Sequence, residues 1–165
     1  MKGKFKTLDV IQQVPINLSL SGSGDEIVEF LADMDIDNDG SGGNPDNDPY
    51  HQNDTTLHRD GKALNAYEEP FVVVPPVICK KTNGLVLGSL CLVENTRTNS
   101  FCFAVVGDIG PMRKVGEGSP ACAKQVGVNP NPVSGGESDK IIRYTIFVGV
   151  PAVIGGRRYV LQSYA

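Results

Sequence analysis

Two carboxylates bracket one glycine-rich stretch of this chain, and their spacing could support hydrolysis of a glycosidic bond. Asp108 follows the apolar run 101–106, and Glu117 stands nine residues later between two glycines, at a predicted helix start. Cleavage of a glycosidic bond needs one carboxyl group that protonates the leaving oxygen and another that activates water or stabilises charge. The alternative is that these Gly-Asp and Gly-Glu pairs only form turns. Spacing alone leaves both interpretations open.

A long acidic segment is the second candidate for chemistry. Residues 21–60 hold eleven acidic residues and one basic residue, Arg59, although the whole chain has a formal net charge of only −4. If these acids share a face, they repel nucleic acid and attract a polycation. We therefore expect no nucleic-acid partner. The alternative is a solvated acidic loop that binds nothing.

Part of this segment resembles the start of a calcium-binding loop. Asp35, Asp37 and Asp39, followed by Gly40, match the pattern D-x-[DN]-x-[DN]-G, and Asp46 takes the twelfth position. The match is incomplete, because the twelfth ligand is usually Glu and no amphipathic helices flank the loop. We therefore predict no metal and no cofactor, with calcium at Asp35, Asp37 and Asp39 as the alternative.

The four cysteines do not indicate a metal centre. They form no CxxC pair, so a zinc site of common spacing is not expected. Three of them lie in apolar, strand-like runs, where a cysteine usually acts as a small buried hydrophobe. We expect free thiols, and three pairings stay open if the compartment is oxidising. The residues are Cys79, Cys91, Cys102 and Cys122.

Length and composition indicate one soluble globular domain. The chain has 165 residues, and its 19 glycines and 11 prolines predict many turns. No apolar run approaches the roughly 18 residues that a membrane span needs, so no membrane partner is expected. Residues 1–7 lack the apolar region of a secretory signal. We assign residues 1–14 to a polar lead-in and residues 15–165 to a single domain.

Strands dominate the elements that must position the carboxylates. Residues 15–20 alternate apolar and polar side chains, and the same alternation from Phe30 to Ile36 places Asp33, Asp35 and Asp37 on one face. Two further strands flank a predicted hairpin turn at residues 94–99. The strands expected after residue 60 are 70–74 continuing into 77–78, 85–93, 100–106, 141–150 and 158–161.

One helix is predicted directly after Glu117. Ser119 suits the N-cap position, Pro120 suits the first helical position, and Gly127 can end the helix. Together with a long polar loop at residues 37–60, about seven strands and one short helix predict a mainly β, barrel-like fold. Periodicity leaves the order of the strands open.

Several separated segments together resemble the fungal-type chitosanases of glycoside hydrolase family 75. They occur in a consistent order over roughly residues 15–150, and their most specific part is the paired Gly-Asp and Gly-Glu motif. The chain departs from these proteins at two points. Asn38 stands where fungal members carry a cysteine, and those members have a signal peptide, whose apolar region is missing from residues 1–7 here. The segments are 33–40, Asn47-Asp48-Pro49 with a Thr-containing stretch, 70–74, 106–108 and 116–119.

The resemblance implies a function and a set of site residues. Members of this family cleave β-1,4-linked glucosamine polymers with inversion, and their catalytic Asp and Glu match Asp108 and Glu117. Asp35 and Asp37 would bind the ammonium groups of chitosan. The expected protein is a secreted, endo-acting monomer whose partner is this cationic polysaccharide.

The Gly-Asp-x-Gly loop is also similar to the double-psi β-barrels of lytic transglycosylases and endoglucanases. This likeness implies a six-stranded double-psi-like β-barrel, with Glu117 as the acid and Asp108 as the base. The dipole of the predicted helix favours an ionised Glu117, so the two roles stay open. The alternative functions are a peptidoglycan-cleaving enzyme of the same fold and a non-catalytic calcium- or carbohydrate-binding module.

Overall fold

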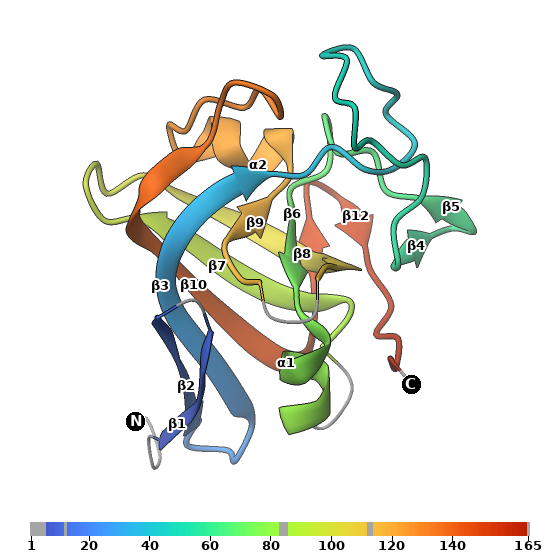
Figure 1. Cartoon of the computed structure of the whole chain (residues 1–165). Coiled ribbons are helices and arrows are strands. Elements are labelled where there is room, and N and C mark those ends of the chain that lie inside the picture. The colour runs from blue at the N-terminus through green and yellow to red at the C-terminus, as the bar shows by residue number, and fades with distance from the viewer. Residues whose placement is uncertain (1–5, 12, 83–85, 112–113, 165) are drawn as a thin grey trace.

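Six strands form a closed barrel at the centre of the molecule (Figure 1). The computed structural model describes residues 6–11, 13–82, 86–111 and 114–164. Neighbours in the order β3-β10-β7-β8-β6-β9 are hydrogen-bonded, and β9 pairs back with β3 to close the ring. The barrel strands are β3 (Glu26–Ile36), β6 (Phe71–Val74), β7 (Ser89–Asn95), β8 (Phe101–Ile109), β9 (Glu117–Gly118) and β10 (Glu137–Pro151).

The barrel is mixed in strand direction. The pairs β3–β9 and β6–β8 are parallel, whereas the other four pairs in the ring are antiparallel. The predicted hairpin is present as β7 and β8, joined by residues 96–100. The prediction of a mainly β fold built on a six-stranded barrel is confirmed.

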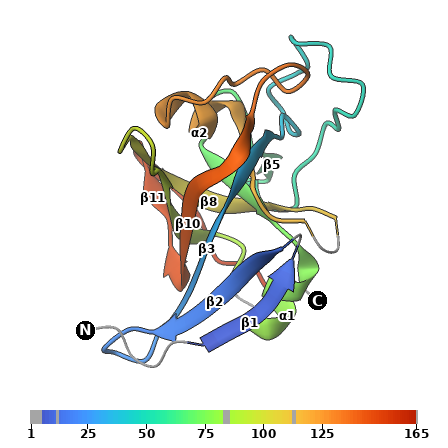
Figure 2. The same ribbon diagram turned by 60° about the vertical axis from the view of Figure 1, so that its left-hand side comes forward.

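A hairpin of two further strands extends one side of the barrel. β1 (Lys6–Ile11) pairs with β2 (Val14–Leu20), and β2 pairs with the first part of β3. Figure 2 shows this hairpin projecting beside the lower half of β3. Ile11, Val14 and Ile16 are buried and anchor it to the core. Residues 6–11 of the expected lead-in therefore belong to the sheet.

The described residues contain two short helices, one more than predicted. α2 (Pro120–Gln125) begins as expected, because Ser119 caps it by accepting a hydrogen bond from the Cys122 backbone. α1 (Pro76–Lys81) replaces the strand expected at residues 77–78. Pro76 fits the first helical position, where a missing N–H costs nothing, so the proline pair starts a helix. Neither helix is long and apolar enough to cross a membrane.

Alternation along β3 fills the barrel interior. Phe30, Ala32 and Met34 are almost fully buried, while Leu31 between them is exposed. The ring of Phe30 stacks on that of Tyr144 in β10, with centroids 5.0 Å apart. The four cysteines are buried free thiols, as expected from the sequence.

Residues 37–57, which connect β3 to β4 (His58–Arg59), contain no helix or strand, and we call them the acidic loop. In Figures 1 and 2 it arches over the end of the barrel at which α2 lies. β4 pairs with β5 (Lys62–Ala63) beyond this loop. Near the C-terminus, β11 (Val153–Ile154) pairs with β12 (Arg157–Arg158), so the strand expected at residues 158–161 is reduced to a short hairpin arm.

Candidate active site

An acidic cleft lies where the acidic loop meets the ends of β8 and β9. It has a volume of about 490 Å³, and Asp108, Glu117 and Asp37 all line it. Asp35 is not among the lining residues. Six of the described lining side chains are acidic and none is basic: Asp37, Asp39, Asp48, Asp54, Asp108 and Glu117. The structure therefore brings the predicted catalytic pair together with Asp37 in one negatively charged hollow.

The register of three strands places the predicted catalytic pair, Asp108 and Glu117, on either side of β6. Val73 in the middle of β6 pairs with Asp108 of β8 on one side and with Glu117 of β9 on the other. A register shift in the β6–β8 pair, between Val72 and Val73, sets Asp108 at this level. Two neighbouring strand spacings separate the backbones of the pair by roughly 10 Å. The two carboxylates thus face the cleft from flanking strands.

Asp108 is held by three hydrogen bonds to one oxygen. Its Oδ1 accepts from the Thr56 backbone N–H at 3.0 Å, the Thr56 hydroxyl at 2.8 Å and the Ile109 N–H at 3.0 Å. The residue is only 6% exposed. Burial raises the pKa of Asp108, and the hydrogen bonds from Thr56 and Ile109 oppose this rise by stabilising the charged form.

Glu117 is also largely buried, but its carboxylate has fewer hydrogen-bond partners than that of Asp108. Its side chain is 13% exposed, and Oε2 is buried with no hydrogen-bond partner among the described residues. The other oxygen, Oε1, lies 3.5 Å from the Lys114 ammonium. Burial raises the pKa of Glu117, and Lys114 opposes this rise. Because α2 has only six residues, its dipole adds little, and burial outweighs it.

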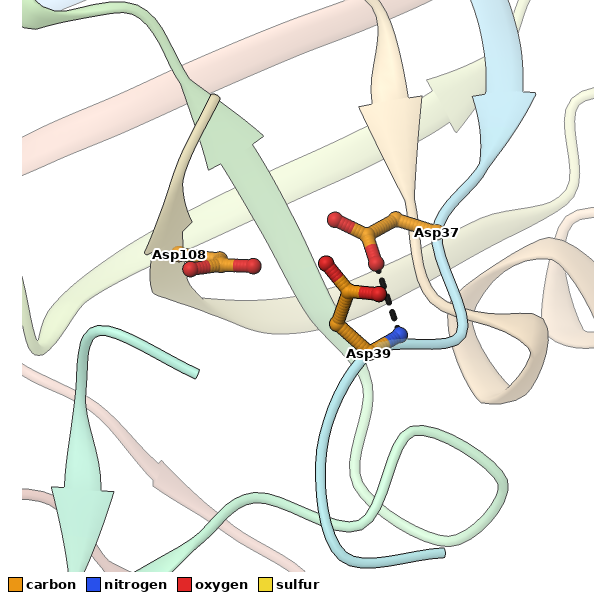
Figure 3. Close-up of side chains that lie close together, drawn as sticks. All are labelled: Asp37, Asp39 and Asp108. Carbon is orange, nitrogen blue, oxygen red and sulfur yellow. Dashed lines mark hydrogen bonds between the residues drawn. The ribbon is translucent and has the colours of Figure 1, made fainter. Parts of the chain in front are cut away.

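Asp37 and Asp39 complete a cluster with Asp108 (Figure 3). One carboxylate oxygen from each of the three lies within 4.8 Å of the others, so the cluster could hold a metal ion. The Asp39 backbone N–H donates to Asp37 Oδ1 at 2.8 Å. Burial raises the pKa of Asp37 to about 8, and the neighbouring carboxylates of Asp39 and Asp108 add to this rise.

Asp35 belongs to a different set of contacts. It pairs with Glu117 in the β3–β9 register, and its Oδ2 lies 2.7 Å from the Lys114 ammonium. Among the described residues, Asp35 therefore lies outside the cluster that Asp37 and Asp39 form with Asp108. Asp46, at the twelfth position of that pattern, accepts a hydrogen bond from the Tyr67 hydroxyl at 2.8 Å.

Asn38 fixes the path of the acidic loop. It is fully buried, and its amide donates to Asn44 Oδ1 and to the Tyr67 hydroxyl, both at 3.1 Å. Its carbonyl oxygen lies 3.1 Å from His51 Nδ1. These contacts hold the loop that carries Asp39 and Asp48 over the cleft. At the position where the resembled fungal members carry cysteine, this chain therefore uses the hydrogen bonds of Asn38 to hold the loop.

A comparison with protein-family models identifies the family of this chain. The model described as fungal chitosanase of glycosyl hydrolase group 75 matches residues 34–163. This chain belongs to that family. The matched range contains the acidic loop, Asp108, Glu117 and most of the barrel. No match was found among curated protein sequences.

Membership of the chitosanase family confirms the resemblance inferred from the motifs. It supports a glycoside hydrolase and a chitosan-like polysaccharide substrate. Sequence reasoning named Asp108, Glu117 and Asp37, but it named neither Thr56 nor Lys114, which contact the two predicted catalytic carboxylates. Thr56 lies 52 residues from Asp108, so only the fold brings the two together. Lys114 lies three residues before Glu117, and this local spacing was a signal that could have marked it.

Proposed function

We propose that this protein is an endo-acting, inverting glycoside hydrolase that cleaves β-1,4-linked glucosamine polymer. The observation that carries the proposal is the placement of Asp108 and Glu117 across β6, both lining one acidic cleft. Inverting enzymes hold their carboxyl groups roughly 6.5–9.5 Å apart to leave room for a water molecule. Strands that flank a common neighbour suit this separation better than the shorter one of retaining enzymes.

Glu117 is the general acid in this mechanism. A carboxyl group whose Oε2 is buried without a partner favours the neutral form, because ionisation there has no compensating hydrogen bond. Glu117 donates its proton to the glycosidic oxygen as the bond from that oxygen to the anomeric carbon breaks. The carboxylate that this transfer leaves is stabilised by the Lys114 ammonium.

Asp108 is the general base. Three hydrogen bonds to Oδ1 favour its charged form. It takes a proton from the water that attacks the anomeric carbon on the face opposite the leaving oxygen. The products are a new reducing end of inverted configuration and a free hydroxyl on the other fragment.

The charge of the cleft supports a cationic substrate. Among the described residues, six acidic side chains and no basic one line it, and each acidic side chain can form a charge-assisted hydrogen bond with a glucosamine ammonium. Asp37 lies beside Asp108 and is the proposed first contact. Asp35 contacts substrate only when its ion pair with Lys114 opens.

Incubation with soluble chitosan, followed by measurement of reducing ends, tests the proposal. Wild type should release reducing ends, and Glu117→Gln and Asp108→Asn should each lower the rate by at least about 10²-fold. Proton NMR of early products should show the inverted anomer first. Full activity of Glu117→Gln, or cleavage of peptidoglycan rather than chitosan, contradicts the proposal.

The Asp37, Asp39 and Asp108 cluster also supports a second candidate, a cation-binding module. A bound calcium ion would occupy the carboxylate that the proposed mechanism uses as a base, so the two functions compete. If the cluster binds calcium, millimolar CaCl₂ should raise the melting temperature and a chelator should lower it. The hydrolase proposal expects chitosan cleavage at full rate in the presence of chelator.

A further inference from the structure

We propose that Thr56 is a positioning residue that holds Oδ1 of Asp108, so that the other oxygen, Oδ2, faces the cleft and the attacking water. This inference rests on the proposed function and adds to it a residue that is neither acid nor base. Thr56 lines the cleft and lies 52 residues before Asp108 in the sequence.

The hydrogen bonds fix the direction of the Thr56 hydroxyl proton. Thr56 Oγ1 accepts from the Ile109 N–H at 3.2 Å and lies 2.8 Å from Asp108 Oδ1. A hydroxyl has a single proton, and an ionised carboxylate can only accept. The proton therefore points at Oδ1, where it joins the N–H groups of Thr56 and Ile109.

This arrangement leaves Oδ2 of Asp108 for the reaction. Oδ2 accepts no hydrogen bond from the part of the chain that the structure describes. Among buried side-chain oxygens in that part, only Glu117 Oε2 lacks a partner, so Asp108 Oδ2 is open to the cleft. A carboxylate with all its fixed donors on one oxygen presents the other in a defined direction, as a general base requires.

The backbone hydrogen bonds explain why Thr56, and not Thr55, holds the carboxylate of Asp108. The Leu57 N–H donates to the Gly107 carbonyl at 3.0 Å, which lays residues 56–57 alongside β8. The Thr55 hydroxyl donates to the Leu57 carbonyl at 2.7 Å and accepts from the Leu64 N–H at 3.0 Å. The two threonines therefore serve different purposes: Thr55 ties the loop to itself, and Thr56 holds Asp108.

Substitution by valine keeps the shape of Thr56 but removes its hydroxyl. In Thr56→Val, the carboxylate keeps its two backbone donors and gains freedom to rotate about its last side-chain bond. Misplacement of a catalytic group can lower the rate by on the order of 10²-fold. We expect kcat on chitosan to fall by about 10- to 100-fold, with KM within about twofold of wild type. Thr56→Ser should recover most of kcat.

The experiment compares wild type, Thr56→Val, Thr56→Ser, Thr56→Ala and Thr98→Val by reducing-end kinetics and melting temperature. Thr98 lies on an exposed hairpin, so Thr98→Val is the control for a threonine-to-valine change and should match wild type. Thr56→Ala decides the matter if Thr56→Val fails to fold, since it also lacks the hydroxyl.

The outcomes separate the inference from the function on which it rests. Wild-type kcat in Thr56→Val or Thr56→Ala overturns the inference while chitosan cleavage stands. Equal loss in the serine and valine variants, together with a lowered melting temperature, also overturns it, because the loss would then be structural. No release by folded wild type overturns the proposed function and this inference with it.

Discussion

At the scale of single residues, Asp108 and Glu117 are two cleft carboxyl groups whose surroundings differ in one respect. Each lies in a mostly dry environment that raises its pKa. Asp108 receives three hydrogen bonds on one oxygen, whereas Glu117 has a buried oxygen with none among the described residues. Pairs of carboxyl groups that share a cleft are assigned roles by such differences. The difference supports Asp108 as the base and Glu117 as the acid.

Lys114 provides a test of this assignment. Its ammonium favours the ionised form of Glu117 and thereby opposes the rise in pKa caused by burial. In Lys114→Met, the pKa of Glu117 should rise further, so the acid stays protonated to higher pH. The alkaline limb of the kcat profile should shift upward, while the acidic limb stays in place. Profiles of reducing-end release over pH 4–9 measure both limbs.

Lys114→Arg is the matched control, because it keeps the charge. Its alkaline limb should remain close to that of wild type. A downward shift of the alkaline limb in Lys114→Met would contradict the role of Glu117 as the acid.

At the scale of elements, β9 is only two residues long and depends on tight packing to place Glu117. Gly116, which precedes it, has φ +91°, and a Cβ there would collide with the side chain and backbone of Asp33. Gly116→Ala should lower the free energy of unfolding by about 2–4 kcal/mol, since backbone strain and overpacking add. Urea denaturation measures this loss, and chitosan cleavage should fall with it.

Gly127→Ala separates the cost of backbone strain from the cost of overpacking. Gly127 also has a positive φ, +72°, but nothing lies within 4 Å of an added Cβ. This variant should lose only about 1–2 kcal/mol, from backbone strain alone. If Gly116→Ala is no less stable than Gly127→Ala, close packing does not position β9.

The elements also show which parts of the site could be predicted from sequence. The second part of strand β3, residues 30–36, and the start of α2 were predicted, because side-chain alternation and the Ser119-Pro120 cap are local signals. Helix α1 was missed, because a proline pair reads equally as a strand breaker and as a helix start. Thr56 could not be found, since its partner lies 52 residues away and a threonine carries no charge to mark it. Closure of the barrel, which brings these residues together, is non-local.

At the scale of the whole molecule, the acidic loop gathers negative charge over one end of the barrel. Charges of like sign in a partly buried cleft oppose ionisation, and the folded protein responds by retaining protons. Asp37 is the clearest case, because burial and its neighbours raise its pKa from the ordinary value of 3.8 to about 8. Ionisation of the cleft carboxyl groups is therefore electrostatically unfavourable in the folded protein, and the positive charge of an ammonium-bearing substrate would reduce this electrostatic strain.

This strain predicts how stability depends on pH. Between about pH 4 and 8, folded Asp37 holds a proton that the unfolded chain has released, so the free energy of unfolding should fall as pH rises through this window. Asp37→Asn removes the group, so the variant should lose less stability over this range and be more stable than wild type at pH 8 by at least about 1 kcal/mol. Urea denaturation at pH 5 and pH 8 measures both values.

Asp25→Asn distinguishes the cleft from the general negative charge of the chain. Asp25 is exposed in the turn between β2 and β3, and its replacement removes one formal negative charge from the sequence, as Asp37→Asn does. If the loss of stability between pH 5 and 8 comes from the packed cleft, Asp25→Asn should follow the wild-type dependence. If both variants flatten it equally, the net charge governs the pH dependence, and the acidic cleft stores no strain of its own.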